Sequence, residues 1–146
     1  MESSLSMSEP TLSRLLLEAF RSLDAEIQAG LRDRGVTELR PSQAAALMLV
    51  DRTGTRLSEL AERGHITKQA MMQVLDELES AGMIRRTADP NDARAKVVKL
   101  TAKGLRQRAE ARRAIGAVES RARRWLGDRR HEALRAILAE LASGEE

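Results

Sequence analysis

The residues best suited to specific chemistry lie in a segment with a helical pattern. Lys68 and Gln69 follow Thr67, and Gln73 follows Gln69 by four residues, which places both amides on one helix face. An amide side chain offers a donor and an acceptor together, and it can bind an adenine edge in the major groove through two hydrogen bonds. Lys68 suits a phosphate oxygen, and Met72 suits a thymine methyl group. This pattern favours contact with DNA; the alternative is the solvated polar face of an ordinary amphipathic helix.

A second candidate surface is a charged hairpin. Two short strand candidates, at residues 83–87 and 96–100, flank a turn at residues 89–94 that is rich in Asp, Pro and Asn. Arg94 and Lys96 fall at or near the tip, where an Arg can enter a narrow minor groove, and Arg86 adds a cation on the first strand. Asp92 is placed to orient the Arg94 guanidinium through a charge-assisted pair. The alternative is an ordinary exposed ion pair in a turn.

Two consecutive short helices are expected just before the hairpin. Ser58 suits an N-cap, and residues 59–63 then form a short helix. Thr67 caps the next helix, which ends at Gly82. The apolar stripe of this second helix consists of Ala70, Met71, Val74, Leu75 and Leu78. Helix, turn and helix followed by a hairpin is the order of a winged helix-turn-helix.

Longer helices flank this region. Apolar residues that recur every three or four positions predict an amphipathic helix from Leu12 to near Gly35, and a mostly apolar helix begins at Pro41. Thr101 caps a long helix after the hairpin, and a last helix follows it. The seam of the long helix consists of Ala111, Ile115, Val118, Ala122 and Trp125. Trp125 is interpreted as a core or dimer-interface anchor, because it lies on this apolar seam.

Composition excludes several classes of protein. The chain has 146 residues and a net charge of +3. It has no cysteine, which excludes disulfides, Cys-ligated zinc and thiol redox chemistry. No apolar run approaches the roughly 20 residues of a membrane span, and Met1 to Ser4 lack the order of a secretory signal, so a cytoplasmic protein without a membrane partner is expected. No catalytic motif, metal-ligand spacing or cofactor motif occurs, so an enzyme is not expected. Glu77 and Glu79 do not share a helical face and are interpreted as solvated residues.

Three stretches resemble the MarR family of bacterial transcription regulators. They read Leu-Ala-Glu-Arg at 60–63, Ile-Thr-Lys-Gln-Ala-Met at 66–71, continued in the same helix by Val74 to Leu78, and DPNDARAKVVKLTAKG at 89–104. The most specific part is the hairpin motif that ends in Leu100-Thr101 at the family's distance after the second helix. The flanking helices agree with the family in number, order and length, so the resemblance extends over nearly the whole chain.

The resemblance implies a fold class that is mainly α with a small β-hairpin wing. A winged helix-turn-helix is flanked by long N- and C-terminal dimerisation helices. The expected boundaries are a flexible N-terminus at 1–10 and a single domain at 11–142, with dimerisation helices at 11–35 and 102–142, the winged helix-turn-helix at 41–101, the helix-turn-helix at 57–82 and the wing at 83–101.

The function implied is that of a sequence-specific DNA-binding transcription regulator. The expected form is a homodimeric repressor that binds a pseudo-palindromic operator and is released by a small-molecule effector. Its partners are then double-stranded DNA, a second copy of the chain and the effector. The residues themselves do not separate a repressor from an activator, nor do they identify the effector; Phe20, Met48 and Arg14 or Arg21 are candidates to line its cleft. The alternatives are a winged-helix protein-interaction module and a non-specific nucleic-acid binder.

The expected DNA-binding residues are Thr67, Lys68, Gln69, Met72, Gln73, Arg86, Asp92, Arg94 and Lys96. Two positions depart from the family's pattern. Ala93 replaces the first of two adjacent basic residues in the wing, so one contact to DNA is expected to be missing. His65 stands where a turn glycine is usual; histidine tolerates left-handed backbone geometry, so the turn is still expected to form, and a pH-sensing role for His65 is left open.

Overall fold

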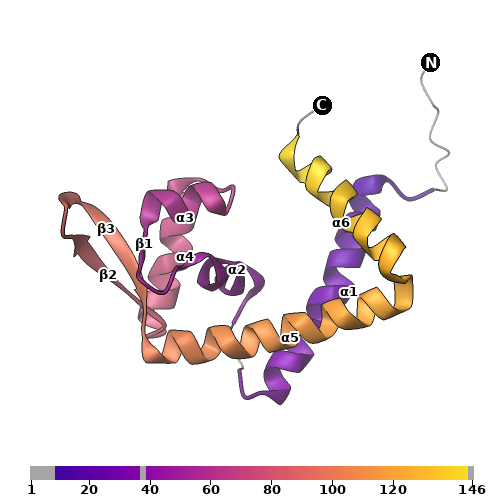
Figure 1. Ribbon diagram of the computed structural model, residues 1–146, viewed down its shortest axis with the longest axis horizontal. Coiled ribbons are helices and arrows are strands. Elements are labelled where there is room, and N and C mark those ends of the chain that lie inside the picture. The colour runs from indigo at the N-terminus through magenta and orange to yellow at the C-terminus, as the bar shows by residue number, and fades with distance from the viewer. Residues whose placement is uncertain (1–8, 37–38, 145–146) are drawn as a thin grey trace. The chain divides into compact units, whose positions relative to one another are not determined.

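The computed structural model describes residues 9–36 and 39–144. The elements in chain order are α1 (Leu12–Asp33), α2 (Pro41–Leu49), β1 (Thr55–Arg56), α3 (Leu57–Arg63), α4 (Lys68–Ser80), β2 (Ile84–Asp89), β3 (Asp92–Leu100), α5 (Ala102–Leu126) and α6 (Asp128–Ser143) (Figure 1). They form two compact units: a winged unit of residues 30–113, and a helical unit of 1–29 with 114–146. The mainly α fold class with a small β-hairpin wing is confirmed.

The core of the winged unit is built where three short helices meet. α2 and α3 both pack against α4, and Leu47, Leu60 and Leu75 are completely buried there. These helices are short and individually weak, so burial of their apolar faces holds them together. In the turn between α3 and α4, His65 has φ 52°, which confirms the left-handed geometry expected at this position. The side chain of Thr67 accepts a hydrogen bond from the Ala70 backbone N–H at 3.1 Å, which confirms it as the N-cap of α4.

The sheet of the winged unit has three antiparallel strands in the order β1-β3-β2. β1 was not expected, because a two-residue strand leaves no pattern in a sequence. β2 and β3 are longer than the sequence indicated, so that only Pro90 and Asn91 form the turn between them. The hairpin extends beyond the helices (Figure 1). Arg94 and Lys96 consequently lie within β3 near the tip.

Two details of the helices differ from expectation. Arg56, rather than Ser58, is the N-cap residue of α3, because β1 runs directly into the helix and leaves no free turn for a serine cap. On α4, Ala70 is exposed, although it was assigned to the apolar stripe. The stripe that is buried consists of Met71, Leu75 and Leu78. Both expectations were wrong because local spacing does not show which neighbour a helix face meets.

The junction between the hairpin and α5 is unusually close. The Thr101 hydroxyl donates to the Gly82 carbonyl at 2.6 Å and accepts from the Gly104 N–H at 3.1 Å, so Thr101 caps α5 as expected. Gly104 is buried, and a Cβ added to it would lie 1.9 Å from the Met83 carbonyl oxygen. Only glycine allows the first turn of α5 to approach this backbone, which explains the Leu-Thr-Ala-Lys-Gly end of the wing motif physically.

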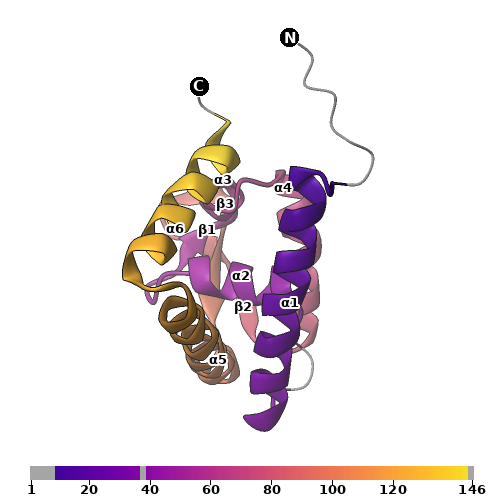
Figure 2. The same ribbon diagram turned by 90° about the vertical axis from the view of Figure 1, so that its right-hand side faces the viewer.

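The helical unit contains most of α1, the second half of α5 and α6. α5 and α6 meet at a sharp bend at Gly127, whose φ is 79° (Figure 2). Glu26 of α1 accepts hydrogen bonds from both ends of the Arg121 guanidinium, the Nε contact at 2.7 Å. Trp125 is 80% exposed, so the expectation of a core anchor is wrong for the single chain, and the dimer-anchor reading stays a prediction.

The predicted domain boundaries stay predictions. The winged helix-turn-helix at 41–101 falls inside the winged unit. The flexible segment predicted at 1–10 lies almost wholly outside the described residues; of it, only Glu9 and Pro10 are described, and they belong to no helix or strand. In the part of the chain that the structure describes, no helix has both the length and the apolar character needed to cross a membrane.

Candidate nucleic-acid interface

The outer face of α4 carries the polar residues that the sequence singled out. Lys68, Gln69, Met72 and Gln73 are all exposed, and Met72 keeps 46% of its surface accessible. The opposite face of the helix is buried in the winged unit, so α4 is anchored on one side and free on the other. Such an anchored helix with short polar side chains on its free face has the form needed to enter a major groove.

A surface hollow of about 650 Å³ lies beside this face, between α4, the hairpin and the start of α3. It brings together six of the nine predicted site residues: Lys68, Met72, Arg86, Asp92, Arg94 and Lys96. Thr67, Gln69 and Gln73 do not line it. Five lining residues were not among the predicted site residues: Arg56, Leu57, Ser58, Glu79 and Ala95. Arg56 was missed because β1 leaves no signal of its own in the sequence and its pairing with β3 is non-local.

The cations around the hollow differ in whether they have a carboxylate partner. Arg56 and Arg86 are held in ion pairs within the winged unit. Lys68, Arg94 and Lys96 are exposed and make no ion pair with any residue that the structure describes. These three unpaired cations are the groups available to neutralise phosphate charge, because a paired guanidinium would first have to leave its partner.

Asp92 does not act as the sequence suggested. Its carboxylate accepts a hydrogen bond from the backbone N–H of Arg94 at 3.0 Å, and within the described residues it makes no ion pair with the Arg94 guanidinium. Asp92 therefore shapes the backbone at the start of β3 rather than aiming the arginine side chain. Within the described residues, the Arg94 guanidinium has no carboxylate partner and is available to bind a group on another molecule.

A second aspartate anchors the hairpin. Asp89 is buried at the end of β2, accepts a hydrogen bond from the Asn91 N–H at 2.9 Å, and forms an ion pair with Arg56 of β1 at 2.6 Å. The hydrogen bond from Asn91, with a further contribution from Arg56, holds the pKa of Asp89 below its ordinary value. This contact fixes the tip of the wing to the first strand.

Arg86 joins the wing to α4. Its guanidinium contacts Asp76 at 2.6 Å and Glu79 at 3.0 Å, and the Glu79 carboxylate also accepts the Arg86 backbone N–H. The side-chain hydrogen bond from Arg86 is the main reason that the pKa of Glu79 is lowered. The expected role of Arg86 in DNA binding stays a prediction. Its contacts with Asp76 and Glu79 hold the hairpin against α4.

Glu77 and Glu79 are therefore not simply solvated, and that interpretation is wrong. Glu77 is bonded to the side chains of Arg40 and Gln43 at the start of α2. The hydrogen bond from Arg40 is the main cause of the lowered pKa of Glu77. Glu77 thus links α4 to the start of α2, and Glu79 links α4 to β2. Together they set the direction in which the outer face of α4 points.

Comparison with known proteins agrees with this architecture. Residues 37–95 match the sequence profile of the MarR family. The HTH-type transcriptional repressor Rv2887 of Mycobacterium tuberculosis strain H37Rv is 37% identical over 102 residues, which span 68% of this chain and 72% of the relative. The exopolysaccharide II synthesis transcriptional activator ExpG of Rhizobium meliloti is 29% identical over 108 residues, 74% of this chain and 56% of the relative.

A solved structure similar to this chain contains DNA. The transcriptional repressor CouR bound to a 23-mer DNA duplex superimposes with a TM-score of 0.79 at 29% identity, covering 96% of this chain and 99% of CouR. CouR from Rhodococcus jostii RHA1 has also been solved with p-coumaroyl-CoA bound. With the anchored helix, the three-stranded wing and a repressor 37% identical over most of its length, the chain belongs to the MarR family of transcription regulators.

Proposed function

We propose that this protein is a sequence-specific DNA-binding transcription regulator that acts as a homodimeric repressor at a pseudo-palindromic operator. The observation that carries the proposal is the exposed face of α4, with two amides one helical turn apart, beside a hollow lined by three unpaired cations. Cations and amides together can supply both affinity and base discrimination, which a purely basic surface cannot.

The residues divide between these two tasks. Lys68, Arg94 and Lys96 contact phosphates or the minor groove, since they carry free charge at the edge of α4 and on the wing. Gln69 and Gln73 face base edges in the major groove, and Met72 is exposed beside them in position for a thymine methyl group. A DNA-binding regulator of this family acts by binding rather than by catalysis, and we place it in the cytoplasm.

Dimerisation is supported by apolar surface on the helical unit. Large apolar side chains remain exposed on α1 and α6, where a soluble single chain gains nothing from them. They are Leu12, Leu15, Leu16, Leu17, Phe20, Leu23, Leu134, Ile137, Leu138 and Leu141. A two-fold dimer that buries these faces would present two α4 helices to half-sites about 34 to 36 Å apart. Sedimentation should then give the mass of two 16.2 kDa chains.

Release by a small molecule is proposed from the family membership. CouR is a repressor that has been solved both with DNA and with p-coumaroyl-CoA. An effector of this chain would act by favouring a dimer whose half-site spacing does not fit the operator, because a ligand shifts an equilibrium only through differential affinity for its two states.

The test is fluorescence anisotropy with labelled DNA from the region beside the protein's own gene, against a scrambled duplex. The native duplex should be preferred by about three decades. Gln73→Ala should lose discrimination at one base pair without changing the salt dependence. Equal binding to both duplexes would instead indicate a non-specific nucleic-acid binder. No binding at low salt would favour a protein-interaction module.

A further inference from the structure

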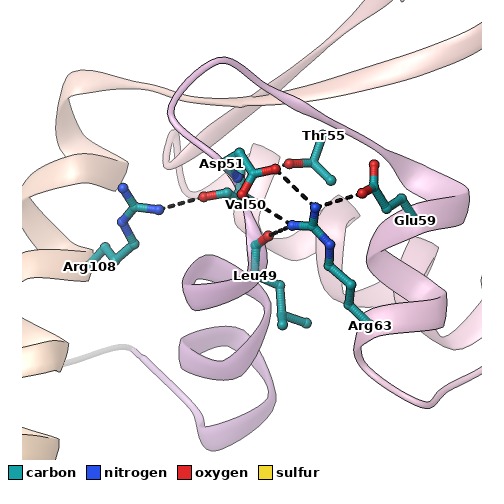
Figure 3. Close-up of polar contacts among 7 residues, drawn as sticks. All are labelled: Leu49, Val50, Asp51, Thr55, Glu59, Arg63 and Arg108. Atoms are coloured by element: carbon teal, nitrogen blue, oxygen red, sulfur yellow. Dashed lines mark hydrogen bonds and ion pairs between the residues drawn. The ribbon is translucent and has the colours of Figure 1, made fainter.

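The C-terminal end of α2 is held by two arginines from different elements (Figure 3). Arg63 of α3 donates to the Leu49 carbonyl at 3.0 Å, and Arg108 of α5 donates to the Val50 carbonyl at 2.5 Å. α2 has no basic residue in its own last turn, and its C-cap residue Val50 is extended. The last carbonyls of a helix lack partners within the helix and carry partial negative charge, so the two guanidiniums supply what the helix itself lacks.

The short connection that follows α2 is held through Asp51, which contacts both Thr55 and Arg63. The Asp51 backbone N–H donates to the Thr55 hydroxyl at 2.8 Å, and the Asp51 carboxylate forms an ion pair with Arg63 at 3.0 Å. Arg63 also pairs with Glu59 one turn earlier in α3. Figure 3 shows Arg63 between Asp51 and Glu59, with Arg108 approaching Val50 from the other side. The connection thus forms part of a continuous set of polar contacts between α2 and α3.

Arg108 is the exceptional member of this set. It is only 6% exposed, and its one polar contact among the described residues is the Val50 carbonyl. Burial, together with repulsion from Arg112 and Arg52, lowers its pKa, so the protein holds a charge where charge is disfavoured. A leucine would fill the same buried position without that cost. The presence of an arginine at this buried position is therefore explained if its hydrogen bond to the Val50 carbonyl has a functional role in addition to filling space.

We infer that Arg108 is a positioning residue for operator binding, which clamps α5 to the end of α2 and thereby sets the orientation of α3 and α4. The route is short: Val50 adjoins Asp51, Asp51 is bonded to Arg63 of α3, and α3 packs against α4. α5 itself continues from the winged unit into the helical unit as one helix. The inference rests on the proposed function, since it assigns to Arg108 the coupling between α4, which reads the operator, and α5, which continues into the helical unit.

The test compares Arg108→Met with Arg108→Lys and with Arg112→Met as the matched control. Methionine keeps the apolar stem but cannot donate, whereas lysine retains a charged donor. Arg112 is exposed on the same helix and has no polar contact within the described residues, so its variant removes the same charge without breaking the clamp. Each variant is titrated with operator, with scrambled DNA, and with operators whose half-sites are moved apart or together by one base pair.

One base pair shifts the half-sites by about 3.4 Å and rotates them by roughly 35°. We expect Arg108→Met to lose about tenfold in operator affinity, the size of one charge-assisted hydrogen bond, and to lose most of the wild-type discrimination against altered spacing. Affinity for scrambled DNA and the salt slope should stay unchanged. Arg108→Lys and Arg112→Met should keep the wild-type spacing preference. A merely structural role would lower all affinities in parallel with the folded fraction.

The inference is overturned if folded Arg108→Met retains wild-type operator affinity and spacing preference. Should that variant fail to fold, Arg63→Gln tests the same joint from α3, where the arginine side chain is 35% exposed. Parallel losses on operator and scrambled DNA in Arg63→Gln would also overturn it, while selective loss of spacing preference would support it. A wild-type chain that never prefers an operator would overturn the proposed function itself, before any variant is considered.

Discussion

Gly104→Ala should destabilise the protein, although helix propensity predicts the opposite. Gly104 lies in the first turn of α5, and alanine in a helix is favoured over glycine by up to about 1 kcal/mol. The added Cβ would meet the Met83 carbonyl oxygen at 1.9 Å and the Met83 carbonyl carbon at 2.9 Å. Both are backbone atoms, so no side-chain rotation relieves the contact. The two backbones must separate by roughly 1 Å, as in an overpacked core.

That separation acts on the hydrogen bonds of the junction. The Thr101 N–H donates to the same Met83 oxygen at 3.0 Å, and the Thr101 hydroxyl donates to the Gly82 carbonyl at 2.6 Å. Loss of these two bonds costs about 1 kcal/mol each, and overpacking costs about 1 to 3 kcal/mol. After the propensity gain is subtracted, we expect Gly104→Ala to lose about 2 to 4 kcal/mol of unfolding free energy.

Urea unfolding followed by circular dichroism measures this change, and Gly116→Ala is the matched control. Gly116 lies in the same helix and is exposed, and a methyl group added there would meet no neighbouring atom within 4 Å. Its substitution should raise stability by about 0.5 to 1 kcal/mol. The reasoning is refuted if Gly104→Ala is as stable as the wild type, or if both variants shift stability in the same direction.

Three further predictions concern α4 and the wing. Thr67→Ala removes the bond to the Ala70 N–H and should cost about 1 kcal/mol in urea unfolding; unchanged stability would contradict the cap. Asp89 has a folded pKa below its ordinary value, so its stabilisation is present above the unfolded pKa of about 3.9 and is lost as pH falls through the folded value. Asp89→Asn should therefore be less stable than the wild type at neutral pH, and its stability should fall less steeply below about pH 4. If thermal melts showed the stability of variant and wild type falling in parallel with pH, the assignment to Asp89 would be wrong. Arg94→Ala should reduce the slope of log affinity against log salt by about 0.9, whereas Arg130→Ala, which removes an exposed charge from α6, should leave it unchanged; equal slopes for the two variants would remove Arg94 from the interface.

Local chemistry made part of this structure predictable from sequence. Thr67 as a cap, the left-handed His65 and the buried part of the apolar stripe of α4, at Met71, Leu75 and Leu78, follow from residue types within a few positions of one another. The hairpin followed from its turn residues, but its length did not, because β3 pairs with β2 as far as Asp92 opposite Asp89, across a register shift that residue spacing does not show. Contacts between residues close in the chain leave a pattern that spacing can reveal.

Long-range polar contacts were not predictable. The Arg56–Asp89 ion pair joins residues 33 positions apart, and Arg108 reaches Val50 across 58 positions. Neither pairing leaves a periodic pattern in the sequence, and the sequence does not show which of its many arginines forms each contact. Trp125 shows what spacing alone does not tell: it matched an apolar seam but is 80% exposed in the single chain, so it is no core anchor there, and its role as a dimer-interface anchor stays a prediction. Periodicity predicts a helix face but not what the face contacts.

Selection of bound duplexes from a random DNA library tests the central claim most directly, because it presupposes no operator. If two α4 helices read DNA as a two-fold dimer, the wild-type protein should enrich an inverted repeat whose half-sites are centred about one helical turn, 10 to 10.5 base pairs, apart. Gln73→Ala should enrich a repeat with one relaxed position in each half-site. Recovery of no shared sequence, or of a single unrepeated site, would contradict the account.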